Sequence, residues 1–292
     1  PVLVARDEAG KLIAVVANYA CHCTTLGDFN QIHGDWSGVA QQLIEAEHPG
    51  AISLVTIGCG ADANPHPRKA GDLEIVRQHG RTFADEVRRL LTTELEPLVG
   101  PIDCRLRKVD LAFAPPPTRE QWEAKAKESG APGHHARQFL ARLDRGETIP
   151  ATYPYPISTW SFGRDLAMVF LGGEVVVDYA MRLKSEHDGK RLWITAYAND
   201  VPCYIASQRI LREGGYEADF SMFYYGRPTR WSDSVEETIV DTVQKLLPHW
   251  FYSAPKQSDF PPPKSPAEGL ASIQVPRGYK VELAASEPLV ED

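Results

Sequence analysis

The chain has 292 residues, of which 43% are hydrophobic, and carries a formal net charge of -8. It is long enough to bury one large core, and its acidic balance lacks the basic stripe of a nucleic-acid-binding protein. No apolar run approaches the ~20 residues of a membrane-spanning helix. The five cysteines lack zinc-finger spacing, and their odd number leaves at least one thiol free.

Apolar runs that alternate with amphipathic stretches predict an α/β domain, which begins with a β-hairpin over residues 1–17. Strands are expected at 12–18, 51–57, 104–113, 157–162, 166–171 and 191–197. Helices are expected at 36–47, 71–95, 176–187, 207–213 and 234–247. This order predicts a mixed, largely buried sheet layered between helices.

Three local features carry secondary predictions. A polar helical hairpin over residues 118–146, broken at 130–133, places His134 and His135 on a solvated surface. Asp35 is interpreted as the cap of the helix at 36–47 rather than as a catalytic group. Cys21 and Cys23 would share one face of a strand.

The C-terminal part of the chain changes in composition after Trp250. We expect a domain over residues 1–255, followed by a stiff proline-rich linker at 256–266. Residues 267–292 are too few to fold alone and are expected to begin a following domain.

Polar loops follow four of the predicted strands, and each contains residues suited to chemistry. In an open, mostly parallel sheet such loops meet at one edge, where α/β proteins bind their ligands. One His, one Glu and one Tyr suit a divalent ion, zinc first. The loops contain His22, Asp62 with Asn64, Glu174, and Asp200 to Tyr204. We therefore expect a metal site at the strand ends.

The motifs around these residues resemble the catalytic domain of the neutral/alkaline, non-lysosomal ceramidase family over roughly residues 1–250. The stretch NYACHCTTL at 18–26 is similar to the family's N-aromatic-x-A-V-H-P-T-S-M, whose His is a zinc ligand. Gly173-Glu174, followed by Ala180 and Arg182, resembles P-G-E…A…R, whose Glu is a zinc ligand. Tyr204 and the later Tyr216-Glu217 keep the family's interval between a zinc-ligating Tyr and a Tyr that contacts the scissile amide.

This resemblance implies that His22, Glu174 and Tyr204 bind Zn²⁺, and that Tyr216 contacts the substrate. Other roles stay open at this stage. Glu174 could instead form an ion pair with Arg182, and both tyrosines could be ordinary half-buried packing.

Two departures from the family pattern matter. The family's other zinc-ligating His lies in a His-Thr-His-type motif that has no counterpart before His22, and we expect it to precede Pro1 in a longer parent chain. The family's active-site Ser lies in G-D-x-S-P-N, where this chain has GADANP at 60–65. Neither Ala63 nor Asn64 can be a hydroxyl nucleophile, so hydrolysis would have to use water, with Asp62 or Asn64 positioning it or the amide.

The implied function is that of a zinc amidohydrolase that cleaves the N-acyl amide of a small, N-acylsphingosine-like lipid. The protein would be exported and able to contact a membrane surface. The tail, IQVPRGYKVELAASEPLV, resembles the start of a bacterial dehydrogenase-type β-propeller domain. Two alternatives remain: a non-catalytic module of ceramidase-like fold, or a hydrolase of other N-acyl amides.

Overall fold

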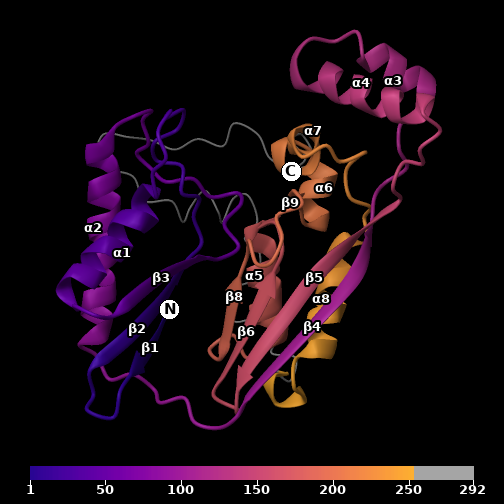
Figure 1. Cartoon of the computed structure of the whole chain (residues 1–292). Coiled ribbons are helices and arrows are strands. Elements are labelled where there is room, and N and C mark those ends of the chain that lie inside the picture. The colour runs from indigo at the N-terminus through magenta and orange to yellow at the C-terminus, as the bar shows by residue number, and fades with distance from the viewer. Residues whose placement is uncertain (253–292) are drawn as a thin grey trace, which may run out of the picture. The chain divides into compact units, whose positions relative to one another are not determined.

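The computed structural model describes residues 1–252, in which strands and helices alternate along the chain (Figure 1). The strands are β1 (Val2–Arg6), β2 (Leu12–Tyr19), β3 (Ile52–Ile57), β4 (Ile102–Ala112), β5 (Thr152–Phe162), β6 (Leu166–Leu171), β7 (Glu174–Val175), β8 (Leu192–Thr195) and β9 (Tyr204–Ile205). The α-helices are α1 (Asp35–Glu47), α2 (Leu73–Leu91), α3 (Arg119–Lys125), α4 (Gly130–Asp144), α5 (Val177–Glu186), α6 (Gln208–Glu213), α7 (Ser221–Tyr224) and α8 (Val235–Leu246). A π-helical turn, η1 (Tyr216–Phe220), precedes α7, and a 3₁₀ turn, η2 (His249–Phe251), follows α8.

The strands form three sheets rather than the single sheet expected from the sequence. The first has the order β1-β2-β3, with an antiparallel β1–β2 hairpin and parallel β2 and β3. The second has the order β4-β5-β6-β8, in which only β6 and β8 are parallel. The third is the short parallel pair β7–β9. The mixed α/β class is confirmed, but strand pairing is a long-range property that the apolar runs do not encode.

The first sheet is covered by α1 and α2, which also pack on each other (Figure 1). A small apolar core fills this interface, with Val15 fully buried and Val87 nearly so. Its buried members are Leu12, Val15, Ala17, Ile44, Ala51, Ala84 and Val87. This burial explains the helical apolar spacing that predicted α2.

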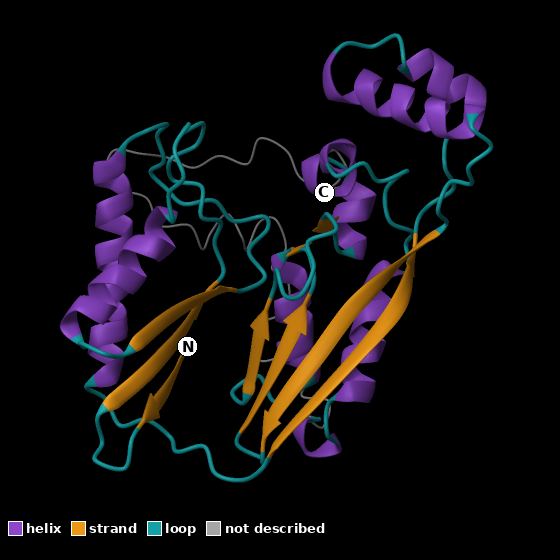
Figure 2. Ribbon diagram, viewed as in Figure 1, coloured by secondary structure: helices purple, strands orange, loops and turns teal. Residues whose placement is uncertain are grey.

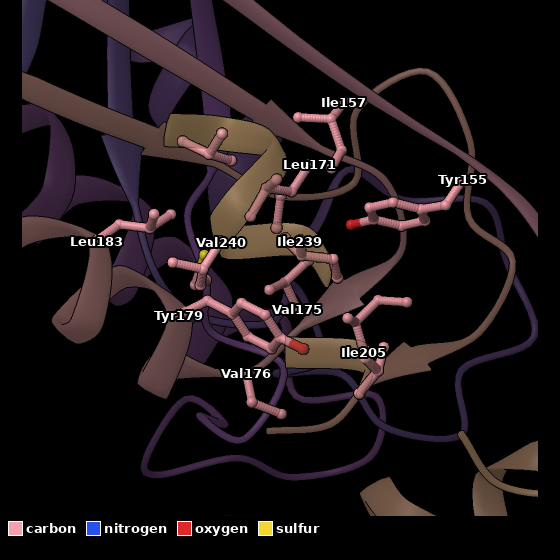
Figure 3. Close-up of a cluster of buried hydrophobic side chains, with 14 of the residues drawn as sticks. Tyr155, Ile157, Leu171, Val175, Val176, Tyr179, Leu183, Ile205, Ile239 and Val240 are labelled. Atoms are coloured by element: carbon pink, nitrogen blue, oxygen red, sulfur yellow. The ribbon is translucent and has the colours of Figure 1, made fainter. Parts of the chain in front are cut away.

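The largest core lies between the second sheet and helices α5 and α8, and it continues into the β7–β9 pair. Figure 3 shows Tyr179 of α5 and Ile239 of α8 in this cluster together with Val175 and Ile205 of the pair. All four side chains are fully buried. The β7–β9 pair is therefore held by the main core of the described chain.

The two larger sheets are joined where β3 and β8 end. The amide of Ala196 donates to the carbonyl of Ile57 at 2.9 Å. The Asn18 side chain donates to the hydroxyls of Thr56, at 3.0 Å, and Thr195, at 3.3 Å. In Figure 2 the loops after β2, β3, β6 and β8 lie at the same end of their strands. The expected gathering of polar loops at one edge is thus present.

Helices α3 and α4 form the expected hairpin, which lies beyond the ends of β4 and β5 (Figure 1). The prediction that both histidines are solvated is wrong for His135, which is 4% exposed. Its ring packs against Trp122 and Phe139 of the hairpin and Phe223 of α7, and its Nε2 lies 2.6 Å from the carbonyl of Arg227. These contacts with α7 and the residues after it come from a distant part of the chain.

Two local predictions near the first loop are also wrong. Strand β2 ends at Tyr19, so Cys21 and Cys23 lie in the following loop, one buried and one exposed, and both are free thiols. Asp35 is the first residue of α1 rather than its cap, and Gly34 takes the cap position. The buried Asp35 carboxylate instead accepts hydrogen bonds from the amides of Leu26 and Trp36.

Within residues 1–252, no helix combines the length and apolar character needed to cross a membrane. The expected linker at 256–266 and the start of a following domain at 267–292 lie outside the described residues, as does the expected domain end at residue 255.

Candidate functional site

His22 is fixed by backbone contacts from the loop after β3. Its amide donates to the carbonyl of Ala63 at 2.9 Å, and Trp36 Nε1 donates to the His22 carbonyl at 2.9 Å. The His22 Nε2 atom lies 2.7 Å from the carbonyl oxygen of Ala61. A carbonyl can only accept, so Nε2 carries the hydrogen and donates it. The other ring nitrogen, Nδ1, is left to face the site.

The loop approaches His22 closely because residue 60 is glycine. A Cβ at Gly60 would lie 2.4 Å from the carbonyl carbon of Ala20 and 2.6 Å from the amide nitrogen of Cys21. Only glycine lets the two backbones meet at this distance. This contact holds Ala61 against His22.

Glu174 and Tyr204 are positioned by the short β7–β9 pair. The two residues are direct partners in this parallel ladder, and the amide of Glu174 donates to the carbonyl of Cys203 at 3.0 Å. Gly173, at φ +76, turns the chain from β6 into β7. The backbone therefore brings an acid and a phenol together on one edge.

The three predicted metal ligands converge. His22 Nδ1 lies 3.7 Å from Glu174 Oε2, with 11% of each side chain exposed. The Tyr204 hydroxyl lies 3.3 Å from the other His22 nitrogen, Nε2. Tyr216 is 46% exposed at the start of η1, and its ring meets that of Tyr204 edge-on at 5.4 Å. That these side chains bind metal or substrate stays a prediction.

Asp62 and Asn64 lie on the loop that holds His22, but both make their contacts elsewhere. Asp62 Oδ1 accepts a hydrogen bond of 3.0 Å from the amide of Val177, the first residue of α5. Asn64 Oδ1 accepts from the hydroxyl of Thr24 at 3.0 Å and from Arg68 at 2.9 Å. Their predicted part in catalysis stays a prediction.

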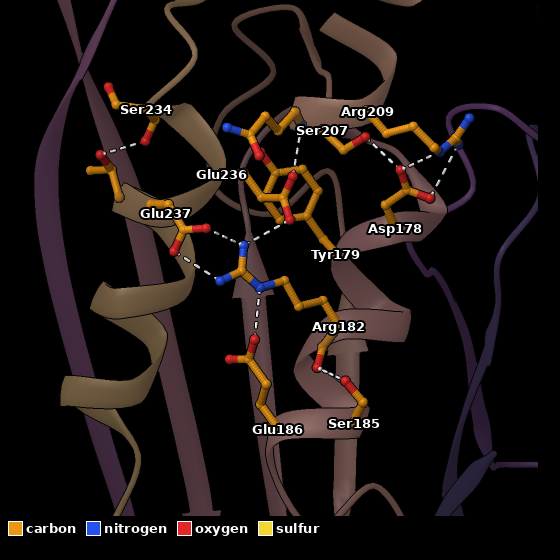
Figure 4. Close-up of polar contacts among 12 residues, drawn as sticks. Asp178, Tyr179, Arg182, Ser185, Glu186, Ser207, Arg209, Ser234, Glu236 and Glu237 are labelled. Carbon is orange, nitrogen blue, oxygen red and sulfur yellow. Dashed lines mark hydrogen bonds and ion pairs between the residues drawn. The ribbon is translucent and has the colours of Figure 1, made fainter. Parts of the chain in front are cut away.

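The alternative partner for Glu174, Arg182, is engaged in an ion-pair network instead. Figure 4 shows its guanidinium among Glu186 of the same helix and Glu236 and Glu237 of α8. These contacts, of 2.7 to 2.8 Å, link α5 to α8. The Glu174 carboxylate is thus left to the site.

Two tyrosines that the sequence analysis did not single out contact Glu174. Tyr197 donates to Oε2 at 3.1 Å, and its hydroxyl is also 3.1 Å from His22 Nδ1. Tyr225, which follows α7, donates to Oε1. The apolar pattern predicts Tyr197 as the last residue of the strand at 191–197, and the nearest polar loop that the sequence marks begins at Asp200.

The phenols of the site remain protonated donors. Burial first, and then the negative charge of Glu174, raise the pKa values of Tyr197, Tyr204 and Tyr225 well above their ordinary range. Burial also raises the pKa of Tyr216. A cation at the site would act in the opposite direction, because positive charge favours the phenolate.

The donor atoms fit a zinc ion. An imidazole nitrogen and a carboxylate oxygen are ordinary zinc ligands, and two bonds of about 2.05 Å can span up to about 4.1 Å, more than the 3.7 Å between Nδ1 and Oε2. The Nε2–H bond to a carbonyl is the usual way a metal-binding His is oriented. Within residues 1–252, no group of three or more His, Cys, Asp or Glu side chains is arranged to hold a metal. The phenol oxygens of Tyr197 and Tyr204 lie 3.1 and 3.3 Å from the His22 ring nitrogens and are further candidate donors.

A cavity of about 450 Å³ lies next to this site rather than within it. Apolar and polar side chains of β2, the loop after it, α1, α2 and the loop after β3 form its walls, among them those of Tyr19, Cys21, Trp36, Asn64 and Phe83. Asn64 is the one predicted site residue on its wall.

Comparisons with known proteins find solved structures with a similar fold. No protein-family model and no curated protein sequence matches the chain. Among solved structures, the neutral ceramidase from Pseudomonas aeruginosa is similar with a TM-score of 0.58 and 16% identity over 87% of this chain. A ceramidase complexed with C2 is similar with a TM-score of 0.59 and 14% identity over 85% of this chain. The chain spans about half of each neighbour, 48% of its length. The resemblance found in the motifs is therefore matched in three dimensions: the described chain has the fold of part of neutral ceramidase.

Proposed function

We propose that the chain is a ceramidase-like, zinc-dependent amidohydrolase that cleaves the N-acyl amide of a lipid-like substrate. The observation that supports this most directly is the approach of His22 Nδ1 to Glu174 Oε2, 3.7 Å apart, in a chain with the ceramidase fold. A tyrosine completes the ligand set, and the motif resemblance assigns that role to Tyr204. Export and contact with a membrane surface belong to the same proposal.

Zinc, when bound, acts as a Lewis acid towards an acyl carbonyl and makes water a stronger nucleophile. The protein's own groups then orient the substrate. Tyr216 is exposed and protonated, so it can donate a hydrogen bond to the oxygen that becomes negative in the transition state. Asp62 and Asn64, on the loop that holds His22, would position water or the amide. Because neither Ala63 nor Asn64 offers a hydroxyl nucleophile, the attack is by water.

The test is a hydrolysis screen of the full 292-residue chain, saturated with zinc at neutral pH, against N-acylsphingosine-like and shorter N-acyl amides. Glu174→Gln should lose zinc and activity together. Glu186→Gln, on the exposed side of α5, is the matched control and should keep both. If the protein cleaves N-acyl amino acids but not the lipid amide, the alternative function, hydrolysis of other N-acyl amides, is the correct one.

The rival is a non-catalytic module with the same fold. It is favoured by the loop at residues 60–65, which offers no hydroxyl nucleophile. Because a further zinc-ligating His is expected before Pro1, the 292-residue chain alone can be inactive. Zinc binding without hydrolysis of any N-acyl amide, short or long, by a chain that includes that segment would establish the non-catalytic reading and end the enzymatic one.

A further inference from the structure

We infer that Tyr225 is a positioning residue of the candidate metal centre, because its hydroxyl holds Glu174 Oε1 and so directs Oε2 towards His22. This role rests on the proposed function and specifies a residue that supports one of its metal ligands. It leaves Tyr204 as the tyrosine that binds the metal.

The carboxylate of Glu174 is contacted through both of its oxygens. Oε2 lies 3.7 Å from His22 Nδ1 and accepts a hydrogen bond of 3.1 Å from Tyr197, whereas Oε1 accepts from the hydroxyl of Tyr225. Tyr204 also shares a hydrogen bond with this carboxylate. A phenol that binds a metal as phenolate has no proton left to donate, so ligation by Tyr204 makes Glu174 depend on its other donors. Tyr225 is a donor to the oxygen that does not face His22.

Pairing of the backbone does not by itself orient the Glu174 side chain. The β7–β9 ladder fixes the main chain of Glu174, but the last side-chain torsion, which turns the carboxylate plane, has only a broad, roughly two-fold preference. Either oxygen could then face His22. A hydrogen bond from a hydroxyl to an ionised carboxylate is stronger than a neutral one, so the bond from Tyr225 can remove this freedom. A metal ligand is effective only when its rotamer is fixed in this way.

The Tyr225 hydroxyl is brought to Glu174 by contacts that do not involve the hydroxyl itself. Tyr225 lies at the C-terminal end of α7, whose Met222 is 1% exposed, and its ring packs against the main core. The ring also meets that of Tyr204 edge-on, with 6.4 Å between the centroids. Burial first, and then the charge of Glu174, raise the pKa of this phenol, which keeps it a donor. A phenylalanine would therefore keep the packing and remove only the hydrogen bond.

The experiment measures zinc affinity by competition with a chromophoric chelator, for the full chain and its Tyr225→Phe and Tyr224→Phe variants. Tyr225→Phe should lower the affinity by about 10–100-fold, the usual cost of losing a partner of a metal ligand. Tyr224 is the neighbouring residue of the same helix and is 62% exposed, so Tyr224→Phe is the matched control and should bind zinc like the parent. Circular dichroism and urea denaturation without metal check that each variant is folded.

A double-mutant cycle tests whether Tyr225 acts through Glu174. The shorter side chain of Glu174→Asp withdraws the carboxylate from the phenol, and this variant should bind zinc more weakly than the parent. Adding Tyr225→Phe to it should then cost less than about twofold, because the two side chains no longer interact. A hydroxyl that only stabilises the fold would cost the same in both backgrounds.

The outcomes separate this role from the proposed function. Unchanged affinity in Tyr225→Phe, or an equal loss in both backgrounds, would refute the role of Tyr225 and leave the proposed function standing. A loss confined to the parent background, in a protein that hydrolyses no N-acyl amide even with the segment expected before Pro1, would sustain the role and refute the enzymatic function. A protein that binds no zinc even with that segment would refute both.

Discussion

Gly60→Ala should damage the candidate site without touching any of its side chains. The new Cβ would lie 2.4 Å from the Ala20 carbonyl carbon, 2.6 Å from the Cys21 amide nitrogen and 2.7 Å from the Ala20 oxygen, whereas ordinary contacts begin at 3.4 Å. The backbones must therefore separate by roughly 1 Å, and all three obstructing atoms are main-chain atoms. Overpacking lowers the free energy of unfolding by about 1–3 kcal/mol. We expect the upper end of this range, because the obstructing atoms belong to the backbone and no side chain can rotate away.

The same displacement separates Ala61 from His22, so the imidazole loses the carbonyl that orients it. We expect zinc affinity to fall by about 10–100-fold, as for other outer-shell changes. Urea denaturation and chelator competition measure the two effects. Gly38→Ala is the matched control, because a Cβ there meets nothing within 4 Å inside helix α1, and its stability should be equal or slightly higher. A Gly60→Ala protein within about 0.5 kcal/mol of the parent and with unchanged affinity would refute the reasoning.

Three further predictions concern the rest of the described chain. Burial raises the pKa of Cys59 and of Cys203 to about 12 each. These thiols ionise near pH ~8.5 only when unfolded. Their contribution to the free energy of unfolding should therefore be constant below that pH and fall above it by up to about 1.4 kcal/mol per pH unit and thiol. Urea titrations at several alkaline pH values measure this slope, which Cys59→Ala should reduce. Of the five thiols, the exposed Cys23 and Cys104 should react with Ellman's reagent in the native protein, and Cys21, Cys59 and Cys203 only after unfolding; fast labelling of a third thiol would contradict this. Arg182→Met should lower the free energy of unfolding by about 1–2 kcal/mol, because it removes the arginine that pairs with three carboxylates, including that of Glu236, whose side chain is 13% exposed. Arg77→Met, at an exposed pair, should lower it by less than about 0.5 kcal/mol. Equal losses in the two variants would show that the α5–α8 network adds nothing.

Local periodicity was sufficient for most elements of the fold. The apolar run at 166–171 coincides with β6, and the helix expected at 234–247 is α8 at Val235–Leu246. The division into three sheets was not predictable, because an apolar run shows that a strand is buried and not which strand it pairs with. His135 was misjudged for the same reason, since its burial depends on Phe223 and Arg227.

The candidate site was predictable only in part. His22, Glu174 and Tyr204 follow apolar strands, so their gathering at one edge could be expected from topology. The place of Tyr197 in the site could not be predicted from the sequence. It depends on a left-handed backbone conformation, which bulky aromatic residues rarely adopt. Tyr225 lies in a helical region whose docking against Glu174 is a tertiary contact.

The β7–β9 pair has a consequence for how related sequences could diverge. Glu174 faces Tyr204 because two short stretches of backbone are in register, about 4.8 Å apart, whatever side chains they carry. Substitutions at the exposed positions of the intervening α5 can therefore accumulate, and the loop before β8 can change length, while this spacing is kept. A single residue inserted between Gly173 and Glu174 would instead turn the carboxylate to the opposite face. Among distant relatives, a small insertion or deletion within β7 or β9 should therefore indicate loss of the candidate site more reliably than a low overall sequence identity does.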